Sequence, residues 1–215
     1  MADIVTLTVN PSMDVWTSVG QLLPFHKLRC TSARRDPGGG GINVARVMHR
    51  FGADVTAMYA QGGTLGQLLR RLLDQEGIPG LPVPITEETR EDFTILEEMS
   101  GRQYRFILPG PTLSEQEWRA FLDTFAAHAL YDQRARFVVA SGSLPPGVPI
   151  DFYGRIAWAT KQTGAKLVID TSGPPLKAAL EAGVYLSNRA CESLKSSPLL
   201  RWRANTIVSA PVVIS

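Results

Sequence analysis

Short apolar runs that alternate with amphipathic segments are the feature of this sequence that most constrains its fold. Ile4–Val9 (IVTLTV) is rich in β-branched residues and ends at an Asn-Pro-Ser turn, which predicts a buried strand leading into a loop that carries Asp14. Ile42–Phe51 has apolar residues at helical spacing, and Asp54–Tyr59 predicts the next strand. A strand, a helix and a second strand in this order are typical of a βαβ unit.

The same rhythm continues along the chain. Ser114 and Glu117 have the spacing of a capping box, which predicts that a helix begins at this point. The other predicted elements are helices at about Gly66–Glu76 and Ile150–Thr163, and strands at Phe137–Ala140, at Lys166–Ile169 and around Val184. The predicted fold class is therefore α/β, with a doubly wound, mostly parallel sheet.

Two segments interrupt this rhythm. Val15–Arg34 and Asp92–Ile107 alternate apolar and polar residues in strand fashion, and the second has a Ser-Gly turn at residues 100–101. Together they predict a small β lid beside the main sheet. A pair of ordinary surface hairpins is the alternative.

Composition limits the partners of the chain. The 215 residues carry a formal net charge of +2 with no basic block, which argues against a nucleic-acid partner and favours an anionic small molecule. Cys30 and Cys191 lack metal-ligand spacing, so we expect a reduced protein without a structural metal. No signal sequence and no run of about 18 apolar residues occurs, which predicts a soluble, cytoplasmic protein without a membrane partner. Trp118 and Trp158 fall on predicted helices and are expected in the core.

A run of four glycines, Gly38–Gly41, stands directly before the first predicted helix. Residues without Cβ expose backbone N–H groups next to the positive end of a helix dipole, so an anion or a polyhydroxylated ligand can approach there. A flexible loop is the alternative, disfavoured because Asn43 and an amphipathic turn follow at once. A dinucleotide-binding fingerprint is also disfavoured, because position 43 is Asn and no acid is well placed about 20 residues further on.

Three motifs together resemble the ribokinase or PfkB-type family of carbohydrate kinases: TLTVNPSMD at residues 6–14, GGGGINVAR at 38–46 and SGSLPPG at 141–147. Within this family, GRQYRFILPG at residues 101–110 is similar to the minor bacterial 6-phosphofructokinase branch. The resemblance covers residues 4 to about 186. It implies a ribokinase-like α/β domain over residues 1–186, with the lid at about 15–34 and 92–107.

The resemblance also implies which residues bind the sugar. Asp14 matches the acid that accepts hydrogen bonds from sugar hydroxyls. Gly39, Gly40 and Asn43 match the loop that holds the sugar through backbone and side-chain amide groups, and Ser143 matches a substrate-contacting serine.

Three cations match the groups that neutralise the phosphate of a phosphorylated sugar: Lys27, Arg90 and Arg105. An ammonium and two guanidinium forks suit a phosphate ligand. Taken alone, each of these residues would be interpreted as a solvated surface charge. Only the resemblance assigns them to a site.

The implied activity is transfer of the γ-phosphoryl group of ATP to fructose 6-phosphate, with Mg ions bridging the phosphates. Fructose 1-phosphate and tagatose 6-phosphate remain possible substrates. Two alternatives stay open, a non-catalytic sugar-phosphate-binding module and a pseudogene product that does not fold. The resemblance also implies a possible homodimer formed through the lid.

Two motifs of the family are missing. The expected Gly-Ala-Gly-Asp, whose helix N-terminus forms an anion hole and whose Asp is the catalytic base, does not occur, and neither does the Asn-x-x-Glu of the Mg-ATP end. We therefore expect no catalytic residue and only part of an ATP site in this chain, and no kinase activity. A sheet without its last strands would expose an apolar edge, which predicts poor stability.

A single-base frameshift near Leu186 accounts for the unusual tail. With permitted codons, residues 187–195 shifted by one base read Lys-Pro-Ser-Leu-Arg-Glu-Leu-Glu, which is similar to the continuation of the family. On this hypothesis residues 187–215 are out of frame. Resequencing that finds no Gly-x-Gly-Asp sequence in the adjacent frame would reject it.

Overall fold

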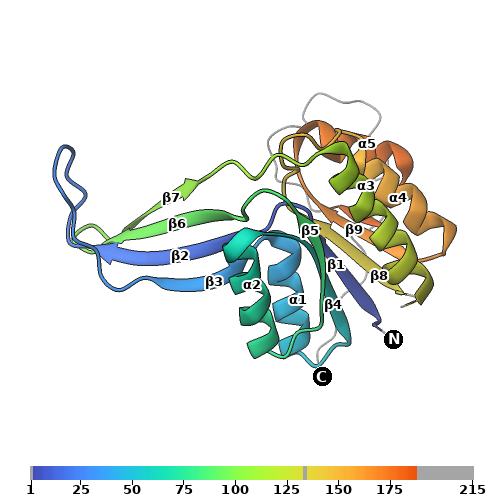
Figure 1. Cartoon of the computed structure of the whole chain (residues 1–215), viewed down its shortest axis with the longest axis horizontal. Coiled ribbons are helices and arrows are strands. Elements are labelled where there is room, and N and C mark those ends of the chain that lie inside the picture. Colours follow the sequence, from blue (N-terminus) through green and yellow to red (C-terminus); the bar gives the residue numbers. More distant parts are fainter. Residues whose placement is uncertain (1, 133–134, 188–215) are drawn as a thin grey trace, which may run out of the picture.

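The computed structural model describes residues 2–132 and 135–187, in which two sheets are present (Figure 1). The larger sheet is parallel throughout, in the order β10-β9-β8-β1-β4-β5. Its strands are β1 (Ile4–Thr8), β4 (Val55–Gly62), β5 (Gly80–Ile85), β8 (Phe137–Ser141), β9 (Lys166–Asp170) and β10 (Leu186–Ser187). The predicted doubly wound, mostly parallel α/β fold is confirmed.

Helices cover both faces of this sheet (Figure 1). One face carries α1 (Gly40–Arg50) and α2 (Gly63–Gln75). The other carries α3 (Glu115–Thr124), which continues as a π-helical segment (Phe125–Asp132), α4 (Phe152–Gln162) and α5 (Gly173–Ala182). Strands covered on both faces read as nearly continuous apolar runs, which is why β1 was visible in the sequence.

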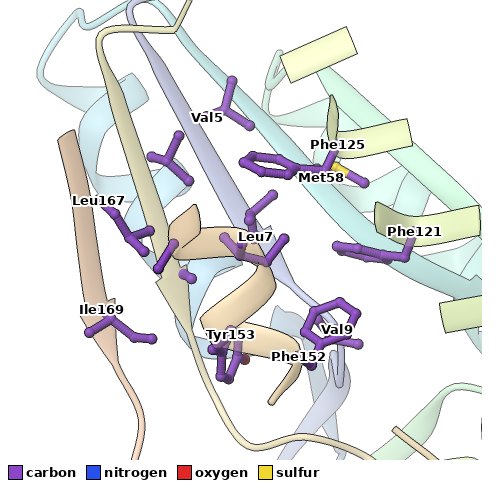
Figure 2. Close-up of a cluster of buried hydrophobic side chains, with 14 of the residues drawn as sticks. Val5, Leu7, Val9, Met58, Phe121, Phe125, Phe152, Tyr153, Leu167 and Ile169 are labelled. Atoms are coloured by element: carbon purple, nitrogen blue, oxygen red, sulfur yellow. The ribbon is translucent and has the colours of Figure 1, made fainter. Parts of the chain in front are cut away.

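The main core lies under α3, α4 and α5. Val5 and Leu7 of β1 are fully buried there (Figure 2). The side chains that the helices contribute include Phe121, Phe125, Phe152 and Tyr153. Side chains alternate along a strand, so Thr8 of β1 points to the other face, where α1 packs.

The capping box predicted from the sequence is confirmed. The Ser114 backbone N–H donates to Glu117 Oε2 (2.7 Å), and the Glu117 N–H donates to Ser114 Oγ (3.4 Å). Burial alone would raise the pKa of Glu117, but hydrogen bonds from Ser114 and from the Thr86 N–H outweigh it and lower this pKa to about 2. Glu117 therefore fixes the start of α3 against the segment that leaves β5.

The smaller sheet is the lid, in the order β3-β2-β6-β7. Its strands are β2 (Ser12–Val19), β3 (Arg34–Gly38), β6 (Arg90–Glu97) and β7 (Arg102–Ile107). β2 pairs parallel with β6 and antiparallel with β3, and β7 pairs antiparallel with β6. The lid extends away from the main sheet, and the loop of residues 20–33 lies at its far end (Figure 1).

The structure corrects the predicted boundaries. Asp14 lies within strand β2 and not in a loop, because Ser12 already pairs with Gly38 and Arg90 in the second sheet. The lid strands accordingly begin at residues 12 and 90, and residues 20–33 connect two strands instead of forming one. Helix α1 begins at Gly40, so Gly40 and Gly41 of the glycine run lie in its first turn.

Tyr185, directly before β10, is 57% exposed, and Leu186, within β10, is 44% exposed. Residues 188–215, which hold Cys191 and nearly all of the predicted out-of-frame tail, lie outside the described residues. Among the helices of the described ranges, none is long and apolar enough to cross a membrane.

Candidate functional site

The predicted site residues other than Lys27 lie where the lid joins the main sheet. β1 leads into β2 through residues 9–11, and β3 leads into α1 at residues 38–40, both at the carboxyl end of β1. Ligands of open parallel α/β sheets bind outside the carboxyl ends of the strands. The junction is therefore the expected place for a ligand.

The start of α1 approaches the main sheet very closely. Gly39 has φ +111°, and a Cβ there would lie 2.6 Å from Thr8 Cγ2. A Cβ at Gly40 would overlap Ser141 Oγ at the end of β8. Asn43 lies one turn further on, is exposed, and donates its backbone N–H to the Gly39 oxygen (2.9 Å). The positive end of α1 thus faces the junction, with Gly39, Gly40 and Asn43 in one turn.

Asp14 lies inside a cluster of charges. In the strand register, Asp14 on β2 lies opposite Asp92 on β6. Its Oδ1 accepts a hydrogen bond from Ser12 Oγ (2.7 Å). Burial raises the pKa of this carboxyl. Ser12 lowers the pKa and the charge of Asp92 raises it, while Arg90 and Arg105 also lower it. The strand register sets Asp14 on the same lid face as Asp92, Arg90 and Arg105.

Arg90 is already engaged by neighbouring groups. Its Nη1 donates to Asp92 Oδ1 (3.1 Å) and to the Leu108 carbonyl oxygen (2.9 Å), and its Nη2 donates to the Asn10 carbonyl oxygen (3.5 Å). The side chain is only 12% exposed. Its buried Nε has no hydrogen-bond partner in residues 2–132 and 135–187. Arg90 therefore joins the exits of β1 and β7 to the start of β6.

Ser143 is hydrogen-bonded to Asn10, which lies just after β1. Asn10 is 6% exposed, and its Nδ2 donates to Ser143 Oγ (3.2 Å). At the end of β8, Ser141 Oγ donates to Asp170 Oδ2 (3.0 Å). The Gly142 N–H donates to the backbone carbonyl oxygen of Asp170 (2.9 Å). The SGSLPPG segment is therefore anchored on β9 and faces the same junction.

Lys27 is the predicted site residue that one copy of the chain does not bring to this junction. It is exposed and belongs to loop 20–33 at the far end of the lid (Figure 1). Leu22 of that loop donates its N–H to Glu97 Oε1 (2.8 Å). Glu97 ends β6 and Arg90 begins it, a separation of about 23 Å along an extended strand. Arg105, by contrast, is an exposed residue of β7 that acts electrostatically on Asp14.

The family profile for pfkB family carbohydrate kinases matches residues 10–189, which span both the lid and the junction. The chain belongs to the PfkB family of carbohydrate kinases. The fold and the family that the sequence predicted are confirmed together.

Named relatives are similar over most of the chain. It is 45% identical over 192 residues to the ATP-dependent 6-phosphofructokinase isozyme 2 of Mycobacterium tuberculosis, covering 89% of this chain and 56% of that protein. It is 40% identical over 183 residues to the Escherichia coli isozyme 2, covering 85% and 58%. The solved phosphofructokinase-2 from Escherichia coli in complex with fructose-6-phosphate aligns with a TM-score of 0.79 and 38% identity, covering 87% and 61%. The chain thus spans less than two thirds of the length of these relatives.

Two residues at the PfkB junction were missed in the sequence, Asn10 and Asp92. Asn10 stands inside the TLTVNPSMD motif, so its position at a strand exit was a usable signal. Asp92 becomes visible only through the parallel register of β2 and β6, which sets it opposite Asp14. In the ranges 2–132 and 135–187, no group of three or more His, Cys, Asp or Glu residues could hold a metal ion.

A hollow of about 510 Å³ is lined in part by Arg90. Besides Arg90 and Leu65, it is lined by residues 87–91 and 108–111, which include the carboxylates Glu87, Glu88 and Glu91. Three acids disfavour an anionic ligand because of the cost of bringing like charges together.

Proposed function

We propose that this chain forms the sugar-phosphate-binding part of an ATP-dependent kinase, and that the complete enzyme converts fructose 6-phosphate to fructose 1,6-bisphosphate. The observation that carries the proposal is the strand register, which sets Asp14 on the same lid face as Arg90 and Arg105, next to Gly38 just before the start of α1. The names of the relatives support the same substrate.

The charges at the junction are suited to a phosphorylated ketose. An ionised carboxylate accepts hydrogen bonds from two hydroxyls, which an unphosphorylated sugar also offers. The exposed fork of Arg105 adds a bidentate donor for a phosphate, and the first turn of α1 adds backbone N–H groups at the positive end of the helix. Within one copy of the chain, Lys27 lies far from Arg90 and Asp14. Its contact with the phosphate therefore remains a prediction.

ATP and Mg ions belong to the proposal for the whole enzyme. The family supports their use in phosphoryl transfer. The predicted inactivity of this stretch rests on the absence of Gly-Ala-Gly-Asp from the printed sequence. Its own residues are proposed to bind and orient the sugar phosphate, not to move the phosphoryl group.

Calorimetry on the purified chain tests the proposal. Fructose 6-phosphate is expected to bind with a dissociation constant of about 1 mM or tighter, the upper end of common Michaelis constants. Fructose, which lacks the phosphate, is expected to bind more weakly by at least about tenfold, because each 1.4 kcal/mol of charge-assisted binding is a factor of ten. ATP is expected to show no turnover with either sugar.

Three outcomes would decide against it. Equal affinity for fructose and fructose 6-phosphate would remove the phosphate site. A chain with no cooperative melting transition would favour the pseudogene alternative, whereas sugar-phosphate binding by a complete protein that never turns over would favour the non-catalytic module.

We also propose that two copies pair through the lid. The strand register sets Val15, Phe93 and Phe106 side by side on one lid face, and Phe106 is 49% exposed. A solved relative is described as the tetrameric inhibited form of phosphofructokinase-2. Sedimentation velocity is expected to give a dimer, and Phe106→Asp is expected to give monomers. A wild-type monomer at about 50 μM, far above the dissociation constant of a stable homodimer, would contradict the pairing.

A further inference from the structure

Arg90 and Asp92 form a closed ring of hydrogen bonds with the backbone of Leu108. Asp92 Oδ1 accepts from Arg90 Nη1 (3.1 Å) and from the Leu108 N–H (3.1 Å). The Leu108 carbonyl oxygen in turn accepts from Arg90 Nη1 (2.9 Å). One carboxylate oxygen therefore ties the start of β6 to the chain that leaves β7.

We infer that Asp92 is a positioning residue, which holds the Arg90 guanidinium so that the remaining N–H of Nη2 reaches the phosphate of the bound sugar. The inference rests on the proposed function and adds to it a residue that does not contact the ligand. A guanidinium is planar, so bonds on one edge fix the direction of the other N–H groups. The Nη2 bond to Asn10 carries the same arrangement to the exit of β1.

Burial makes this arrangement stiff. Both side chains are 12% exposed, so water competes little for their hydrogen bonds. Arg90 begins β6 and Asp92 lies two residues along the same strand, on the same face. Without Asp92, the guanidinium would keep only its two carbonyl acceptors, which lie on segments outside the lid strands.

The charge of Asp92 and its position have opposite effects on the affinity for an anionic sugar. Its negative charge offsets part of the positive charge of Arg90 and lies directly opposite Asp14. Charge alone would therefore weaken the binding of an anionic sugar. Since geometry and charge have opposite effects, substitutions that remove one or both can separate them.

Calorimetry with fructose 6-phosphate on three variants provides the test. Asp92→Ala removes the acceptor, and affinity is expected to fall about tenfold or more, as for loss of one charge-assisted hydrogen bond. Asp92→Asn keeps an oxygen acceptor, and affinity is expected within about threefold of wild type or tighter. Asp36→Ala is the matched control. Asp36 also lies opposite Asp14 in the strand register, but its ion pairs are with Arg34 and Arg46 and not with Arg90, so affinity is expected within about twofold.

Measurements with fructose, which has no phosphate, distinguish positioning of Arg90 by Asp92 from a purely structural role of Asp92. Asp92→Ala is expected to change the affinity for fructose less than about twofold, because Arg90 is positioned for the phosphate. An equal loss for both sugars, an equal loss in the Ala and Asn variants, or an equal loss in Asp36→Ala would overturn the inference.

Failure of the proposed function has a separate signature, which is that wild type does not bind fructose 6-phosphate. The positioning is then read from the side-chain NMR signals of Arg90, whose Nη rotation is expected to be slow in wild type and in Asp92→Asn and fast in Asp92→Ala. Unchanged rotation in Asp92→Ala would overturn the positioning itself.

Discussion

Replacing Gly41 by alanine is expected to destabilise the chain by about 2 kcal/mol. The new Cβ would lie 2.5 Å from the Leu7 carbonyl oxygen and 2.5 Å from Thr8 Oγ1, so α1 would have to move away from the central strand β1. Such overpacking costs about 3 kcal/mol, and the better helix propensity of alanine returns about 1 kcal/mol. At about 2–4 °C per kcal/mol, the melting temperature should fall by about 4–8 °C.

Gly20→Ala is the matched control for this change. A Cβ at Gly20 meets no atom within 4 Å, and its φ is not positive, so stability should stay within about 0.5 kcal/mol. Both variants are compared by urea unfolding followed by circular dichroism. If Gly41→Ala unfolded at the same urea concentration as Gly20→Ala, α1 would not lie as close to β1 as the proposed site requires.

The elements that the sequence predicted are those with strong local signals. β1 was visible because a strand buried on both faces has an apolar, β-branched run, and α3 was visible from its capping box. β5 was missed because its sequence, GLPVPI, contains two prolines, which are tolerated only because β5 is an edge strand. α5 was missed because Gly173-Pro174-Pro175 looks like a helix breaker, although proline is favoured in a first helical turn.

Trp118 and Trp158 differ in burial, and the helical spacing of buried residues on α4 explains the difference. Trp118 is 6% exposed, as predicted, but Trp158 is 63% exposed, and its predicted place in the core was wrong. Tyr153 and Ile156 on α4 are fully buried and three residues apart, which defines the inner face of that helix. Trp158 follows Ile156 by two residues and therefore points away from the core.

The site was less accessible from the sequence than the fold. The motifs indicated Asp14, the glycine run and Ser143, but their proximity depends on how residues far apart in the sequence pair in the lid. Only the register of β2 with β6 sets Asp92 beside Asp14. The same non-local pairing engages Arg90 and keeps Lys27 at a distance, and no local pattern reports either fact.

Replacing Asp14 by alanine is expected to weaken fructose 6-phosphate binding by at least about 100-fold. Two sugar hydroxyls would each lose a hydrogen bond to a charged acceptor, worth about 1.5–3 kcal/mol apiece, and about 1.4 kcal/mol corresponds to tenfold. Binding by wild type should also weaken as the pH is lowered, because the protonated carboxyl is a poorer acceptor. Since burial raises the pKa of Asp14, this loss should begin at a higher pH than for an exposed aspartate.

Asp14→Asn separates this effect from two others. The phosphate of the ligand has its own pKa of about 6, so the variant should keep that component of the pH profile and lose the component from Asp14. A raised pKa in the folded state means that ionisation of Asp14 opposes folding as the pH rises, so Asp14→Asn should melt at the same or a higher temperature near neutral pH. Lost binding in a variant at least as stable as wild type would mark Asp14 as a ligand contact that the fold does not need. Retained binding, with an unchanged pH profile, would show that the carboxylate does not hold the sugar.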